Sequence, residues 1–262
     1  MKIKSILKLG TLALLTAALP ACSFLDTDPQ IIPDDGYYNS EQKLIYGLAG
    51  VYGVLNSEAL YGNYYSLQIA NADDLCYFNN YNNSESRPDR YNHSAGTAAI
   101  YDTWSKLYEG IKNANRYIEA VEKTEIDPEK LSVDIGLYIA EARFLRAWFY
   151  FDLVRFYGRV PLVDENSPQE NAPREELTKV MTFIKGDVEY AVANLDNTLG
   201  GEVACLGSAL MLQLQIAQYE YDNATVIACA KAIKELGYDL YGDFRKLFLD
   251  EGINDPSNRE VI

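Results

Sequence analysis

The sequence predicts an all-α fold built from paired helices. Apolar residues recur at steps of three and four over six stretches of the chain, which is the spacing of one face of an α-helix. No stretch alternates apolar and polar residues in the way that a half-buried strand does. A hydrophobic fraction of 48% with 23% charged residues is typical of a globular protein, and 262 residues suit one large domain or two modest ones.

The first three helices are expected over residues 40–55, 98–123 and 135–157. The first two carry one apolar stripe each, which predicts helices packed on one side. The third is apolar most of the way round, so we expect it to be buried against neighbours on several sides. Gly158 follows it as a C-terminal cap, and the chain then leaves in extended form over residues 160–163.

The third helix also contains charged residues whose positions can be predicted from helical spacing. Phe149 and Leu153 belong to its densest apolar stripe, whereas Glu141 is placed off the buried face. Asp152 and Arg155 are three residues apart, so we expect them to pair at the exposed edge of the helix.

Three more helices are expected over residues 175–195, 208–219 and 224–236. A short polar turn joins the last two, which predicts a close pair. Small residues at steps of four along the final helix allow such a close approach, as in tetratricopeptide pairs, although no strict 34-residue period is present. These small residues are Ala224, Ala228 and Ala232.

The amino-terminal segment has the pattern of a bacterial lipoprotein signal. Lysines precede an apolar run, and Ala21 directly precedes Cys22. We therefore expect cleavage after residue 21, a lipid anchor on Cys22, an extended tether over residues 22–39 and the folded domain over residues 40–262. The alternative is an ordinary secretory signal with an incidental cysteine. A membrane-spanning helix is disfavoured, since the apolar run is about half of the ~20 residues that spanning requires.

Charge and residue content exclude several classes of partner. The formal charge is −15, and loss of residues 1–21, which contain three lysines and no acids, makes it −18. Such a chain repels nucleic acid, and no basic patch is present. His93 is the only histidine, and Cys76, Cys205 and Cys229 lack metal spacing, so we expect neither a metal nor a cofactor. Cys205 and Cys229 fall within apolar helical patterns and are interpreted as core residues.

The segment between the first two helices, residues 70–98, differs from the helical framework. It mixes tyrosines with many amides and with charged groups. Sugar binding uses flat rings against C–H faces, together with planar polar groups for paired hydroxyls. The alternative is a solvated loop whose polar side chains bond their own backbone. The candidate ligand-binding residues are Asp74, Tyr77, Tyr81, Arg87, Arg90 and Tyr91.

Several sequence blocks together resemble the SusD/RagB family of outer-membrane nutrient-binding lipoproteins. The similarity is carried by residues 22–29, 104–115, 141–162, 237–248 and 258–262, and the third block is the most specific. The resemblance implies a tetratricopeptide-like helical superhelix with irregular loops. It also implies a lipid-anchored protein on the outer face of the outer membrane. Such proteins capture oligosaccharides for a partner TonB-dependent (SusC-like) transporter. Family members are about twice as long, so we interpret the chain as an N-terminal portion.

Two functions from different classes remain open at this point. One is a non-catalytic protein that passes glycan to a transporter, and the other is a helical-repeat surface scaffold that binds protein or peptide. A glycosidase is a distant third, because the adjacent carboxylates of this acidic chain, such as Asp73 and Asp74, are typical of solvated surface. We expect no catalytic residues.

Overall fold

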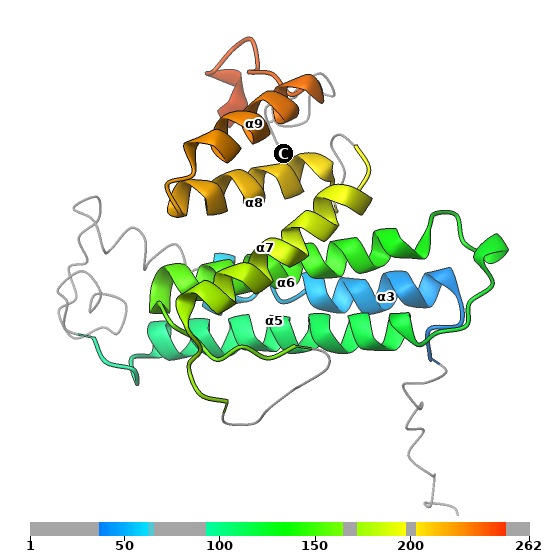
Figure 1. Ribbon diagram of the computed structural model, residues 1–262, viewed down its shortest axis with the longest axis horizontal. Helices are drawn as coiled ribbons and strands as arrows, with labels where there is room; N and C mark the ends of the chain where they lie inside the picture. Colours follow the sequence, from blue (N-terminus) through cyan, green and yellow to red (C-terminus); the bar gives the residue numbers. More distant parts are fainter. Residues whose placement is uncertain (1–36, 63, 65–92, 165–171, 198–202, 250–262) are drawn as a thin grey trace, which may run out of the picture. The chain divides into compact units, whose positions relative to one another are not determined.

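A computed structural model describes residues 37–62, 64, 93–164, 172–197 and 203–249 (Figure 1). The chain divides into residues 1–37 and 38–262, and the architecture below is that of the second unit. Its α-helices match the six that the sequence predicts, to within about two residues at most ends. They are α3 (Glu41–Tyr52), α5 (Ala98–Glu122), α6 (Ile135–Tyr157), α7 (Leu177–Asn194), α8 (Leu206–Tyr219) and α9 (Asn223–Glu235).

The all-α class is confirmed for the residues described above. Short helical turns lie between long helices at η1 (Glu58–Gly62) and η3 (Pro128–Lys130), and a third, η4 (Lys246–Phe248), follows α9. The extended segment after α6 makes one isolated antiparallel bridge, between Pro161 and Arg174, and no strand occurs in these residues. None of the helices described is long and apolar enough to cross a membrane.

Helix α6 is the core helix of the unit. It packs against α5 and α3 and also against α7, and Figure 1 shows α5 and α6 side by side. The side chain of Asp134 accepts a hydrogen bond from Gly136 N at 2.7 Å and caps the first turn. Gly158 ends the helix with φ of 69°, a left-handed conformation that favours glycine. The predicted burial on several sides is confirmed by fifteen buried residues along α6.

Two predictions about charged residues of α6 are wrong. Asp152 does pair with Arg155, but its side chain is fully buried instead of lying at an exposed edge. Glu141 is also buried, with 3% of its surface exposed. Both carboxylates are buried because tyrosine hydroxyls from other segments donate to them. Tyr61 donates to Asp152 Oδ2 at 2.6 Å, and Tyr52 donates to Glu141 Oε2 at 2.7 Å.

Helices α8 and α9 form the predicted pair, but through a different face of α9. Leu210 of α8 packs with Cys229 and Ile233 in a small second core, and the burial of both Cys205 and Cys229 is confirmed. Of the predicted small-residue stripe, Ala224 and Ala228 are exposed, and only Ala232 packs against this second core. The spacing of the alanines did not predict the contact face, because Cys229 and Ile233 are also four residues apart and are the buried side chains of α9.

Candidate functional site

The residues predicted to bind ligand lie outside the part of the chain that the structure describes. They belong to residues 65–92, and Cys22 likewise lies outside the described residues. These candidates therefore stay predictions. It does describe the two positions that flank the segment, Tyr64 before it and the exposed His93 after it.

A hollow of about 460 Å³ lies where this segment leaves the helices, and Tyr64 is one of its walls. One side is formed by the stretch that follows α3, and the other by the first turns of α5. The lining residues are Ser57, Glu58, Ala59, Tyr64, Asp102, Ser105, Lys106 and Glu109.

The α5 side of the hollow follows from helical spacing. Counted from Asp102, the other three lining residues of α5 follow after three, four and seven positions, which places all four on one face of the helix. They are Ser105, Lys106 and Glu109. The opposite face of α5 is apolar and packs on α6. Lys106 Nζ lies 2.7 Å from Glu109 Oε2, an exposed pair that contributes well under about 1 kcal/mol.

The other side of the hollow is fastened to α5 and α6 by buried groups. The Thr103 hydroxyl, fully buried, lies 2.7 Å from the carbonyl oxygen of Ala59 and donates to it. Behind it, Trp148 Nε1 donates to the Tyr61 hydroxyl, and that hydroxyl donates to the buried carboxylate of Asp152. These bonds fix η1 in place, so the hollow has rigid walls on both sides.

Ser57, one of the residues that line this hollow, has a buried hydroxyl oxygen. Its Oγ is buried and has no hydrogen-bond partner among the described residues. A buried polar atom without a partner costs about 1–3 kcal/mol, so folded proteins rarely keep one without a reason. Because this oxygen is itself buried, the structure does not present it to a ligand in the hollow.

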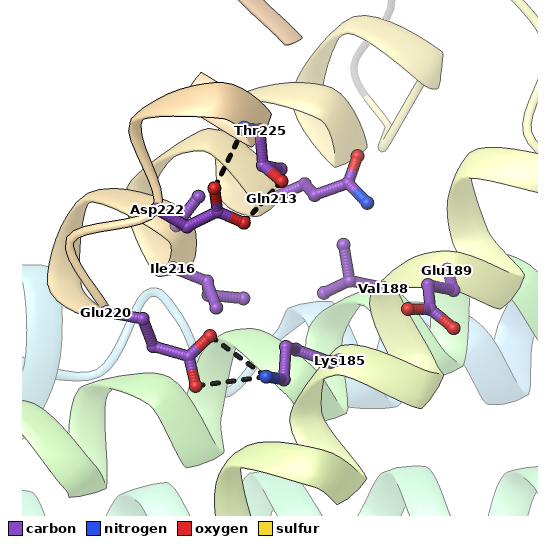
Figure 2. A pocket seen from close by; sticks show the side chains of 9 residues that line it. Lys185, Val188, Glu189, Gln213, Ile216, Glu220, Asp222 and Thr225 are labelled. Carbon is purple, nitrogen blue, oxygen red and sulfur yellow. Dashed lines mark hydrogen bonds and ion pairs between the residues drawn. The ribbon is translucent and has the colours of Figure 1, made fainter. Parts of the chain in front are cut away.

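A second hollow, of about 200 Å³, lies at the junction of α7, α8 and α9 (Figure 2). Its floor is apolar, with Val188 and Ile216 buried. Its principal polar groups already bind one another. Lys185 Nζ lies 2.9 and 3.0 Å from the carboxylate oxygens of Glu220, which joins α7 to the α8–α9 turn.

Asp222, which follows that turn, caps the first turn of α9. Asp222 accepts hydrogen bonds from the hydroxyl and the backbone N–H of Thr225, which hold the pKa of Asp222 below its ordinary value (Figure 2). This is the normal role of an aspartate that precedes a helix. We therefore interpret the second hollow as a helix junction, and the hollow beside α5 as the candidate site.

Sequence reasoning missed the residues that line the candidate site. A polar face on α5 could be recognised from its spacing, but such a face is equally typical of solvated surface. Only the three-dimensional path of residues 57–62 shows that it borders a hollow. In the described residues, no group of three or more His, Cys, Asp or Glu is arranged to hold a metal ion.

Comparison with known proteins gives consistent relatives. The SusD-like family described as "Starch-binding associating with outer membrane" matches residues 23–204. SusD-like protein P25 of Formosa agariphila is 25% identical over 255 residues, which cover 91% of this chain and 47% of that protein.

Solved structures agree with the fold. A SusD-like protein from Bacteroides fragilis has a TM-score of 0.71 at 23% identity, covering 88% of this chain and 45% of that one. A laminarin-binding SusD-like protein has a TM-score of 0.72 at 23% identity, covering 83% and 50%. The chain thus spans about half the length of the relatives that it matches.

Proposed function

Because this chain belongs to the SusD-like family, we propose that it is a surface binding protein that captures oligosaccharides without cleaving them. The structural observation that supports the proposal is the hollow beside α5, whose described lining includes three carboxylates and the hydroxyl-bearing residues Ser57, Tyr64 and Ser105. Those groups match the hydroxyl-rich surface of a sugar, since each can accept a hydrogen bond from it. The laminarin-binding neighbour supports glycan as the class of ligand.

The segment of residues 65–92 supplies the aromatic part of the proposed site. It begins directly after Tyr64, which lines the hollow. We propose that its tyrosines stack on sugar rings and that its charged groups bond paired hydroxyls. The proposed platforms are Tyr77, Tyr81 and Tyr91, and the proposed hydroxyl partners are Asp74, Arg87 and Arg90.

The same family membership supports a location and a partner. The family description places its members in association with the outer membrane. We propose that lipid on Cys22 anchors the chain at the cell surface. There the protein would pass its ligand to a TonB-dependent (SusC-like) transporter.

Calorimetric titration of the full-length protein tests glycan binding. The source cells are grown on a panel of polysaccharides, and oligosaccharides of the one that induces the gene serve as ligand. Replacing one correct tyrosine among Tyr77, Tyr81 and Tyr91 by alanine should weaken binding by roughly 1–3 kcal/mol through lost stacking area. Tyr46→Ala is a matched control, because Tyr46 is an exposed tyrosine of α3 and should leave affinity unchanged.

The outcomes separate the remaining functions. Undiminished binding in the triple alanine variant would remove these tyrosines from the site. Release of free sugar during incubation would show an enzyme. Absence of binding to every glycan, together with capture of a defined peptide or protein, would favour the helical-repeat scaffold.

A further inference from the structure

We propose that Asp152 of α6 is a positioning residue for glycan binding, and that it acts through Tyr61 on one wall of the hollow beside α5. The inference rests on the proposed glycan-binding function and adds a residue on which binding depends although it does not line the hollow. It is carried by two hydrogen bonds that fasten residues 52–61 to α6.

The end of this stretch that is nearer the hollow is held by a buried carboxylate. Asp152 is fully buried, and Tyr61 donates a hydrogen bond to its Oδ2 at 2.6 Å. The same hydroxyl accepts a bond from Trp148 Nε1, and the two rings meet edge to face with centroids 6.1 Å apart. Tyr61 is therefore fixed by its hydroxyl and by its ring, three residues before Tyr64, which lines the hollow.

The backbone that Tyr61 belongs to is an unusual turn. Gly62 N donates to the carbonyl oxygen of Ser57 at 3.2 Å, a bond that spans five residues and makes η1 a π-helical turn. Such turns are rare and are found frequently at functional sites. Ser57, Glu58 and Ala59 line the hollow, so this turn and the residue before it form the wall opposite α5.

A second contact of the same chemistry holds the other end of the stretch. Tyr52 donates to Oε2 of the buried Glu141 at 2.7 Å. Glu141 and Asp152 are eleven residues apart on α6, which is about 16 Å along a helix. Tyr61 lies within the turn that forms the wall, whereas Tyr52 ends α3 nine residues earlier. The two contacts therefore differ in their place relative to the hollow and not in their chemistry.

A buried carboxylate is a costly way to hold a tyrosine if stability is the only gain. Apolar side chains of similar size often stabilise a fold as well as buried charged groups do. A hydrogen bond to a fixed carboxylate does set the direction and distance of its donor, which an apolar contact leaves less defined. Without that bond the wall would reach its binding position for only part of the time, and the affinity would fall by that fraction.

The test compares Tyr61→Phe with Tyr52→Phe, because each removes one hydroxyl that is bonded to a buried carboxylate of α6. Affinity is measured by calorimetric titration of the full-length chain with oligosaccharides of the polysaccharide that induces the gene. We expect Tyr61→Phe to weaken binding about tenfold. Tyr52→Phe should leave affinity unchanged. It should lower the melting temperature at least as much, since the Tyr52 hydroxyl also accepts a bond from Ala204 N at 2.7 Å.

A double variant separates positioning from stability. Tyr61→Phe/Asp152→Leu replaces both bonded groups by apolar ones of similar size, a change that is often nearly neutral for stability. We expect it to regain part of the melting temperature that Tyr61→Phe loses and none of the affinity. Asp152→Asn keeps an oxygen for the Tyr61 hydroxyl, so it should retain affinity within about threefold of the wild-type value. It is also the variant to use if the double variant misfolds.

The outcomes distinguish this inference from the function beneath it. Wild-type affinity in Tyr61→Phe, or affinity that follows the melting temperature through all four variants, would overturn the positioning role while glycan binding stands. Failure of the wild-type protein to bind any of these oligosaccharides would contradict the glycan-binding function itself, and the positioning role with it.

Discussion

Three charged side chains of α6 are buried, and each is bound by groups from other segments of the chain. Glu141, Arg146 and Asp152 are at most 3% exposed. Arg146 makes two parallel bonds to Asp187 of α7, at 2.7 and 2.8 Å, and a third to Asn115 of α5 at 2.8 Å. Buried charges of this kind add little net stability but are costly to leave unpaired, so they specify which helices must meet.

Asp187→Asn tests that argument at the Arg146 pair. The change leaves the Arg146 guanidinium buried without its counter-charge, and we expect the free energy of unfolding to fall by about 3–5 kcal/mol. Urea denaturation measures it. The control is Lys185→Gln, also on α7, which breaks the partly exposed pair between Lys185 and Glu220. It should lower the free energy of unfolding by less than about 1 kcal/mol. Similar losses from the two variants would mean that the Arg146 pair is not isolated from water.

Glu141 predicts a dependence of stability on pH. Burial, with the charge of Asp196 as a lesser cause, raises its pKa from 4.5 to about 7, although the bond from Tyr52 opposes the shift. The folded state therefore holds this proton more tightly than the unfolded chain. The resulting stability is complete below about pH 4.5 and is lost as the pH rises through about 7.

Glu141→Gln should remove that pH dependence, because glutamine cannot ionise and keeps an oxygen for the Tyr52 hydroxyl. Relative to the variant, the wild-type protein should lose up to about 3 kcal/mol of unfolding free energy between weakly acidic and weakly alkaline pH. Urea titrations at a series of pH values measure the difference. Parallel curves for the two proteins would show that Glu141 ionises normally in the fold.

At the scale of elements, the sequence predicted the helices themselves. It predicted the contacts between helices only in part. The 3.6-residue period marks which face of α5 or α7 is apolar, and it places each of these helices to within about two residues of its observed ends. The burial of Glu141 and Asp152 could not be predicted in this way, because it depends on Tyr52 and Tyr61, which are about ninety residues distant in sequence. The hollow was missed for a similar reason, since a polar helix face looks the same whether it borders a site or bulk water.

Close approach of α5 and α6 gives a prediction for an element interface. A Cβ added at Gly110 would lie 2.6 Å from the ring of Phe149, which is fully buried. Gly110→Ala should therefore destabilise the fold by about 1–3 kcal/mol, even though alanine favours a helix. Gly186→Ala in α7 is the control, because its Cβ meets nothing within 4 Å and should stabilise by up to about 1 kcal/mol. Thermal unfolding of both variants measures the change in stability. A Gly110→Ala variant that is more stable than the wild-type protein would show that α5 and α6 can move apart.

At the scale of the whole molecule, the sequence combines an acidic helical fold with a segment that we propose carries lipid. None of the described helices can span a membrane, and the formal charge of −15 opposes binding to anionic lipid. The membrane attachment that we propose rests on Cys22, which follows an apolar run and a small residue. More than one acyl chain is needed for stable anchoring, which a lipoprotein amino terminus provides.

We therefore expect Cys22→Ala to abolish attachment. In cells fed radiolabelled palmitate, the wild-type protein should carry label and sediment with membranes, whereas the variant should be unlabelled and remain in the soluble fraction. Cys76→Ala is the matched control, since it removes a different cysteine, one outside the helices that the sequence predicts, and should keep both the label and the membrane location. Label that persists in Cys22→Ala would place the lipid on another residue. An unlabelled variant that still sediments would show that the partner transporter, and not the lipid alone, holds this protein at the membrane.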